Sequence, residues 1–196
     1  MTRFVGLTGG IGAGKSETLA AFERLGAATL STDRVAHDLL DDDEVRAALV
    51  ERWGKEIAPG GSVDRDRVSE IVFNDRDELV WLESITHPRV GVHVLEWRQI
   101  LDPDVPVAVV EVPLLFEAAM EDAFDATVAV IADDGLRDSR LRDRGQGGLE
   151  GREARQLDQA EKASRADHVI RNDASLEELE SEVKRVIEQL SVGGPR

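Results

Sequence analysis

A glycine-rich stretch near the start of the chain constrains its fold more than any other feature. Residues 9–16 read Gly-Gly-Ile-Gly-Ala-Gly-Lys-Ser and match the phosphate-loop pattern G-x-x-x-x-G-K-[ST]. An apolar run at residues 4–7 precedes them, and a helix-compatible run follows at residues 17–25. A phosphate loop requires this context, because it joins a strand to the first turn of a helix. The stretch therefore predicts an α/β fold with a phosphate site after its first strand.

The residue types in this loop indicate its chemistry. Glycines let the backbone N–H groups turn inward and form a nest for phosphate oxygens. Lys15 stands where the helix begins, so its ammonium and the helix dipole both act on the β- and γ-phosphates. The Ser16 hydroxyl is a ligand for Mg²⁺. The dinucleotide pattern G-x-G-x-x-G fails, because lysine occupies position 15 where that pattern needs glycine. We predict a nucleoside triphosphate as the ligand, bound by Gly10, Ile11, Gly12, Ala13, Gly14, Lys15, Ser16 and Thr18.

Further apolar runs predict the rest of a sheet. They lie at residues 27–31, 106–112, 124–132 and 168–170. Runs that are apolar throughout are typical of parallel strands buried on both faces. An amphipathic helix is predicted over residues 175–190, with Ser175 as N-cap and Glu178 as its capping-box partner. The sequence therefore predicts five strands in a nucleotide-binding core that comprises residues 1–36, 104–136 and 166–196.

The core is interrupted first by a long stretch without strand signals. Residues 37–103 show apolar side chains only at helical spacing, which predicts a helical insertion. His87, which precedes Pro88, is expected to mark the start of a helix there. Its local sequence favours a structural histidine over a ligand-binding one.

Arginines dominate the second interruption, residues 137–165. Arg137, Arg140 and Arg144 lie near one face of a predicted helix, and a glycine-rich linker and a second helix at residues 153–162 follow. Arginines on a movable segment suit a lid that closes over phosphates and excludes water. The alternative is an exposed helix whose arginines pair with Asp138 and Asp143.

Two acids follow predicted strands. Asp33 follows residues 27–31 after Thr32, and Glu111 ends the buried stretch that starts at Val107 within the run at residues 106–112. Ligands of open α/β sheets lie at the carboxyl ends of the strands, so both acids belong near the phosphate loop. Glu111 is a candidate partner of Mg²⁺ through water. Asp33 is a candidate site residue or the N-cap of the next helix, and the two roles are compatible.

Composition limits the partners of the chain. With 24 basic and 40 acidic residues its net charge is -16, which argues against broad contact with nucleic acid or an anionic membrane. The chain has no cysteine, which excludes disulfides and thiolate metal sites. Its apolar runs are too short to span a bilayer, and its start does not read as a signal peptide. We expect a cytoplasmic protein without nucleic-acid or membrane partners, and the sequence leaves its oligomeric state open.

Motifs along the whole chain resemble the dephospho-CoA kinase family. The similarity rests on the phosphate loop with its preceding Thr8, on Asp33, Asp64-Arg65, Thr86-His87-Pro88, Pro113-Leu114-Leu115-Phe116-Glu117, the arginines at 140 and 144, Gln159, and residues 166–172. The resemblance implies a P-loop NTPase three-layer α/β fold, with a five-stranded parallel sheet, a helical acceptor-binding insertion and a lid. It also implies transfer of the ATP γ-phosphoryl group to the ribose 3′-hydroxyl of dephospho-CoA, the last step of coenzyme A biosynthesis.

The same resemblance implies roles for single residues. Asp33 looks like the catalytic base, Lys15 and Arg140 like catalytic cations, and Arg140 and Arg144 like phosphate clamps. The acceptor site that the resemblance implies contains Thr8, Asp33, Arg65, His87, Leu114 and Glu117, and the Mg²⁺ site contains Ser16 and, through water, Glu111. The family commonly has Asp-x-Asp where this chain has Ser31-Thr32-Asp33, and Asp where it has Glu111.

Two other functions compete with this one. The first is a P-loop kinase for another small acceptor, such as a nucleoside monophosphate or a sugar-like alcohol. The second is a nucleotide-dependent switch protein, although the guanine-reading N-K-x-D motif of GTPases is missing. The predicted insertion and lid favour group transfer, because they would close an acceptor pocket.

Overall fold

The structure is a computed structural model that describes residues 2–143 and 156–192. The chain forms two compact units. The sheet unit comprises Met1–Ser31 and Leu101–Arg196, and the helical unit comprises Thr32–Ile100. The structure thus divides the chain at the end of the second strand and after residue 100, a few residues before each boundary expected for the insertion.

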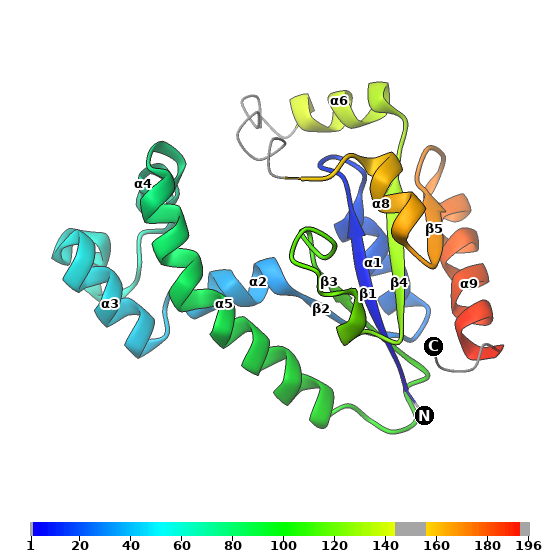
Figure 1. Cartoon of the computed structure of the whole chain (residues 1–196), viewed down its shortest axis with the longest axis horizontal. Helices are drawn as coiled ribbons and strands as arrows, with labels where there is room; N and C mark the ends of the chain where they lie inside the picture. The colour runs from blue at the N-terminus through cyan, green and yellow to red at the C-terminus, as the bar shows by residue number, and fades with distance from the viewer. Residues whose placement is uncertain (1, 144–155, 193–196) are drawn as a thin grey trace. The chain divides into compact units, whose positions relative to one another are not determined.

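Five parallel strands form the centre of the sheet unit, in the order β2-β3-β1-β4-β5 (Figure 1). This confirms the predicted five-stranded parallel sheet. The runs predicted as strands contain or closely match the observed ones; the central strands β1, β3 and β4 are almost wholly buried, while the edge strands β2 and β5 are mostly half-buried. The strands are β1 (Arg3–Gly9), β2 (Ala28–Ser31), β3 (Val107–Glu111), β4 (Ala126–Ile131) and β5 (His168–Arg171).

Helices cover both faces of this sheet (Figure 1). On one face α1 (Lys15–Arg24) and α9 (Leu176–Val192) pack against alternate residues of β1 and β4 in one apolar core. On the other face α8 (Gln159–Arg165) packs against β4 and β1. Helix α6 (Asp134–Asp143) follows β4 and contacts the loop after β1. The core side chain Phe22 is fully buried, and burying a side chain of this size stabilises a fold by about 1.5–3 kcal/mol.

The helical unit has a core of its own. It consists of α2 (Thr32–Leu39), α3 (Asp43–Trp53), α4 (Arg65–Asn74) and α5 (Arg76–Gln99). Short 3-10 turns lie at Lys55–Ile57 and Pro59–Gly61, and the sheet unit has another at Glu121–Ala123. The side chains buried in this second core are Leu40, Val45, Leu49, Ile57, Val63 and Val68. Within residues 2–143 and 156–192, no helix is both long and apolar enough to cross a membrane.

Helix α5 corrects one prediction. It runs through Pro88, so His87 does not mark a helix start. A proline inside a helix removes one backbone hydrogen bond and crowds the preceding turn. Two side chains donate to backbone carbonyls in this region: Thr86 Oγ1 to Leu82 at 2.9 Å and Arg89 Nη1 to Ile85 at 2.8 Å. The long helix thus contains a residue that usually ends one.

Other helix boundaries were predicted with mixed success. The capping box of α9 is confirmed, since the Glu178 N–H donates to Ser175 Oγ at 3.3 Å and the Ser175 N–H donates to Glu178 Oε2 at 3.0 Å. The N-cap role of Asp33 is wrong, because α2 already includes Thr32. Within the helix predicted over residues 153–162, residues 156–158 are not helical and α8 begins at Gln159, where Asp158 caps it by accepting from the Glu161 N–H. Residues 144–155, with Arg144 and the predicted linker, lie outside the described residues.

Candidate phosphate-binding site

The loop between β1 and α1 needs glycine at two positions for steric reasons. Gly12 and Gly14 have φ values of 77° and 93°, in the left-handed region that side chains disfavour. A Cβ atom on Gly14 would lie 2.1 Å from Asn172 Nδ2. A Cβ atom on Gly12 would lie 3.1 Å from the Arg137 carbonyl oxygen. The motif glycines therefore permit both the backbone curl and the close approach of neighbouring residues.

Lys15 and Ser16 open helix α1. Lys15 Nζ donates to the carbonyl oxygens of Gly9 and Gly10, both at 3.1 Å, so the ammonium lies across the start of the loop. The Ser16 side chain is exposed. The Thr18 hydroxyl is buried and donates to the Gly14 carbonyl at 3.1 Å, which fixes the first helical turn. The predicted contact of Thr18 with ATP stays a prediction, and the structure gives its hydroxyl a role inside the loop.

Two arginines of α6 contact this loop. Arg137 Nε donates to the Ile11 carbonyl at 2.9 Å, and its Nη1 lies 2.8 Å from Asp134 Oδ1. Arg140 Nη1 is near the carbonyls of Gly12 and Ala13, at 3.4 and 3.5 Å. Neutral carbonyl oxygens at these distances are weak partners for a guanidinium. Phosphate oxygens would be stronger partners, so this arrangement suits an anion-binding site.

Asn172 completes the loop, and our sequence reasoning did not select it as a site residue. Its side chain is buried, and Nδ2 donates to the Ala13 carbonyl at 2.9 Å. The backbone carbonyl of Asn172 accepts a hydrogen bond from Arg140 Nη2 at 3.0 Å. Asn172, which directly follows β5, thus contacts both the loop and Arg140, a predicted catalytic cation. Only its place in the resembling segment 166–172 could have drawn attention to it.

Oxygen donors for a metal ion are present at the same edge of the sheet. Glu111 ends β3 and is 5% exposed, and it pairs in register with Leu7 of β1 and Ser31 of β2. Among the described residues, no group of three or more His, Asp or Glu side chains could hold a metal ion. Mg²⁺ usually keeps several waters and binds through one or two protein oxygens plus substrate phosphates. The donor set of Ser16 and Glu111 fits Mg²⁺ bound together with a nucleotide.

Two of the acceptor-site residues predicted in the sheet unit, Thr8 and Glu117, both contact Lys162. The Thr8 hydroxyl is fully buried and donates to the Pro113 carbonyl at 3.1 Å. Glu117 Oε1 forms an ion pair with Lys162 Nζ at 3.0 Å and accepts from the Leu157 N–H at 2.8 Å. Burial lowers the pKa of Lys162, and the Glu117 carboxylate opposes that shift. Leu114, the third acceptor-site residue predicted in this unit, is half-buried. Sequence reasoning did not select Lys162, because nothing in its local sequence marks it.

The acceptor-site residues predicted in the helical unit are exposed. Asp33 lies in the first turn of α2. His87 lies on α5, and because its side chain is exposed it is not part of the core. Arg65, which opens α4, pairs with Asp41 at 3.2 Å and Asp38 at 3.8 Å. The pKa of Asp41 is held below its usual value, mainly by a hydrogen bond from the backbone of Val63.

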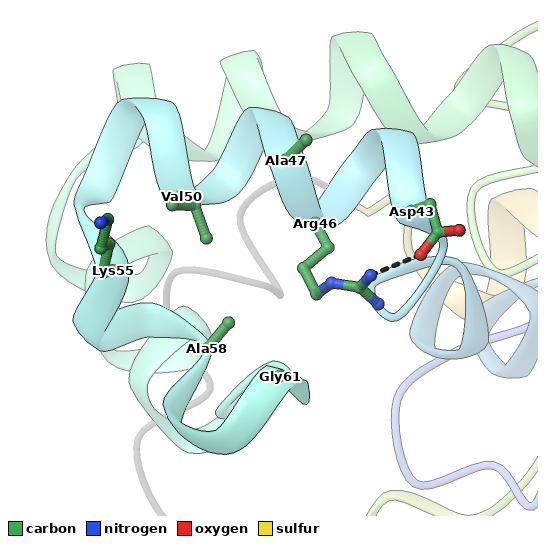
Figure 2. A pocket seen from close by; sticks show the side chains of 7 residues that line it. All are labelled: Asp43, Arg46, Ala47, Val50, Lys55, Ala58 and Gly61. Carbon is green, nitrogen blue, oxygen red and sulfur yellow. Dashed lines mark hydrogen bonds and ion pairs between the residues drawn. The ribbon is translucent and has the colours of Figure 1, made fainter.

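The helical unit also has a hollow of about 400 Å³ between α3 and the two 3-10 turns (Figure 2). Apolar side chains of Ala47, Val50 and Ala58 line it. The Arg46 guanidinium points to Asp43 and forms an ion pair with it (Figure 2). None of the predicted acceptor-site residues lines this hollow.

Comparisons with known proteins identify the family of this chain. The family model for dephospho-CoA kinase matches residues 3–178. A dephospho-CoA kinase of Streptomyces avermitilis is 40% identical over 185 residues, which cover 91% of this chain and 89% of that protein. A solved dephospho-CoA kinase from Campylobacter jejuni is similar with a TM-score of 0.70 at 30% identity, over 98% of this chain and 99% of that one.

A more distant structure shows the fold alone. Shikimate kinase from Acinetobacter baumannii, at 14% identity, has a TM-score of 0.53 over 98% of this chain and 97% of its own. The architecture is therefore that of P-loop kinases. Given the family match over most of the residues described above, the chain belongs to the dephospho-CoA kinase family, a family of ATP-dependent kinases.

Proposed function

We propose that this chain transfers the γ-phosphoryl group of ATP to the ribose 3′-hydroxyl of dephospho-CoA, giving CoA and ADP. The observation that carries the proposal is a phosphate loop contacted by Lys15 and Arg140 in a chain of this family. Phosphoryl transfer needs positive charge around the γ-phosphoryl group and an oriented nucleophile, with little covalent help from the protein. The loop and its cations meet the first of these needs.

The nucleophile would be oriented by Asp33. Its place in the chain supports this role, because it stands two residues after β2, whose carboxyl end lies at the same edge of the sheet as the phosphate loop. The carboxylate would accept the proton of the ribose hydroxyl as the new P–O bond forms. Arg65 and His87 would contact the acceptor, and Thr8, Leu114 and Glu117 would shape its site from the sheet unit.

Mg²⁺ would be held by the Ser16 hydroxyl and, through water, by Glu111. When bound, the ion supplies charge that offsets the negative charge on the β- and γ-phosphates. Lys15, Arg140 and, by family resemblance, Arg144 would bind the remaining phosphate oxygens. Because Lys15 and Arg140 are held at the loop by hydrogen bonds, their charge would act with little reorganisation during the reaction.

A coupled assay of ADP release with ATP, Mg²⁺ and dephospho-CoA, with product analysis by mass spectrometry, tests the proposal. We expect equal amounts of ADP and of a product heavier by one phosphoryl group, and neither from the Lys15→Ala variant. If ATP binds and dephospho-CoA is not consumed, the acceptor assignment is wrong. A panel of nucleoside monophosphates and sugar-like alcohols would then identify a kinase for another acceptor, and slow ATP hydrolysis alone would favour a switch protein.

A further inference from the structure

Lys162 is a buried cation to which the proposed reaction assigns no role. It lies in α8 and its side chain is 0% exposed. Its Nζ lies 2.6 Å from the Pro113 carbonyl, 3.0 Å from Glu117 Oε1 and 3.5 Å from Thr8 Oγ1. An ammonium has three protons to donate, so each has an acceptor within the protein. Lys162 is therefore placed to hold parts of the protein together, and it does not face solvent or a ligand.

These contacts join three parts of the sheet unit. Thr8 belongs to β1, one residue before that strand ends at the loop. Pro113 and Glu117 belong to the segment that follows β3, and Glu117 also accepts from the Leu157 N–H just before α8. The Thr8 hydroxyl donates to the Pro113 carbonyl, which closes a ring of contacts through the ammonium. Lys162 thus ties the segment after β3 to the strand that carries the phosphate loop.

The position of this segment links it to the acceptor. Strand β3 lies beside β1, which leads to the phosphate loop. The segment at residues 113–117 therefore starts at the same edge of the sheet as the loop that would hold the transferred phosphoryl group. A displacement of about 1 Å in such a position lowers phosphoryl-transfer rates by up to about 100-fold, because the reacting atoms lose their alignment.

Stability alone does not account for a buried pair of this kind. Removing two charges from water costs free energy that their attraction often fails to recover, and well-packed apolar residues serve a core equally well. We propose that Lys162 is a positioning residue for the acceptor: it fixes the segment at residues 113–117 against β1 and thereby sets the affinity and turnover for dephospho-CoA. This inference rests on the proposed function.

Neutralising both partners tests this role. Lys162→Met alone leaves the Glu117 carboxylate buried and unpaired, so it confounds positioning with instability. The double variant Lys162→Met/Glu117→Gln removes both charges and keeps the volume. We expect it to melt cooperatively and to bind ATP within about twofold of wild type, because the phosphate loop keeps its contacts. Its kcat/KM for dephospho-CoA should fall on the order of 10- to 100-fold, with KM raised.

Two matched variants serve as controls. Lys184→Met removes an exposed lysine of α9 and should change nothing. Glu117→Gln alone keeps an oxygen that accepts from Lys162, so it measures what the Glu117 carboxylate itself contributes to the acceptor site. The proposal is overturned if the double variant has wild-type kinetics, if it fails to melt cooperatively, or if Glu117→Gln reproduces the whole loss. A wild-type enzyme that does not phosphorylate dephospho-CoA would instead refute the proposed function.

Discussion

The candidate residues of the two units are held in different ways. In the sheet unit Lys15, Arg140 and Asn172 bond to backbone carbonyls of the loop, so they are part of its structure. In the helical unit Asp33 is exposed, and Arg65 pairs with carboxylates that are themselves at the surface. Substitutions in the sheet unit should therefore alter binding and stability together. Substitutions in the helical unit should alter function while the fold stays intact.

Asp33→Asn tests this separation with the largest expected effect. Loss of the general base should lower kcat by about 10²- to 10⁴-fold, because the ribose proton then lacks an acceptor. The melting temperature and the ATP dissociation constant should stay at wild-type values, since the side chain is exposed and the loop is untouched. Steady-state kinetics, calorimetric melting and ATP titration measure the three quantities. Near-normal turnover would show that Asp33 is not the base.

Arg140→Ala probes the other side of the comparison. We expect kcat to fall by about 10³-fold, because a cation that offsets transition-state charge is lost. ATP should bind more weakly as well, since the same guanidinium contacts the loop carbonyls. Arg142→Ala, which removes an exposed arginine of the same helix, is the matched control. Equal losses in both variants would mean that the net charge of α6 matters and the position of Arg140 does not.

Asn172→Ala should have an effect of intermediate size on stability. The Ala13 carbonyl loses its buried donor, which we expect to lower the free energy of unfolding by about 1–3 kcal/mol. ATP affinity should fall by several-fold, because the loop loses its contact with the Asn172 side chain, while the backbone carbonyl of residue 172 still accepts from Arg140. Urea unfolding and ATP titration measure these changes. A variant with full stability but weak ATP binding would contradict the coupling that we infer for the sheet unit.

Asp41→Asn should have the smallest effect, and its effect should depend on pH. The folded-state pKa of Asp41 lies below the ordinary value, so the carboxylate stabilises the fold above that value and loses this contribution as the pH falls through the folded pKa. The side chain is partly exposed, so we expect less than about 1 kcal/mol at neutral pH. Urea unfolding should show the difference between variant and wild type vanishing in acid. A difference that persisted there would show that the charge is not its cause.

Features formed by residues that are neighbours in the sequence could be predicted, and contacts between residues far apart in the sequence could not. The loop at residues 9–16 and the strands were predictable, because each is a local pattern with one physical meaning. Asn172 and Lys162 were not, because they meet the loop and its strand from about 150 residues away and only packing brings them there. The helix start at Pro88 was predicted wrongly. Proline usually lies at a helix end, but α5, a helix of 24 residues, continues through Pro88.

The position of the new phosphoryl group tests the central claim most directly. Proton–phosphorus correlation spectroscopy on the product formed from ATP and dephospho-CoA would identify the oxygen that carries it. Our account predicts a single new phosphate ester at the ribose 3′-oxygen, in an amount equal to the ADP released. A phosphate at another oxygen, or ADP formed without any phosphorylated product, would contradict it.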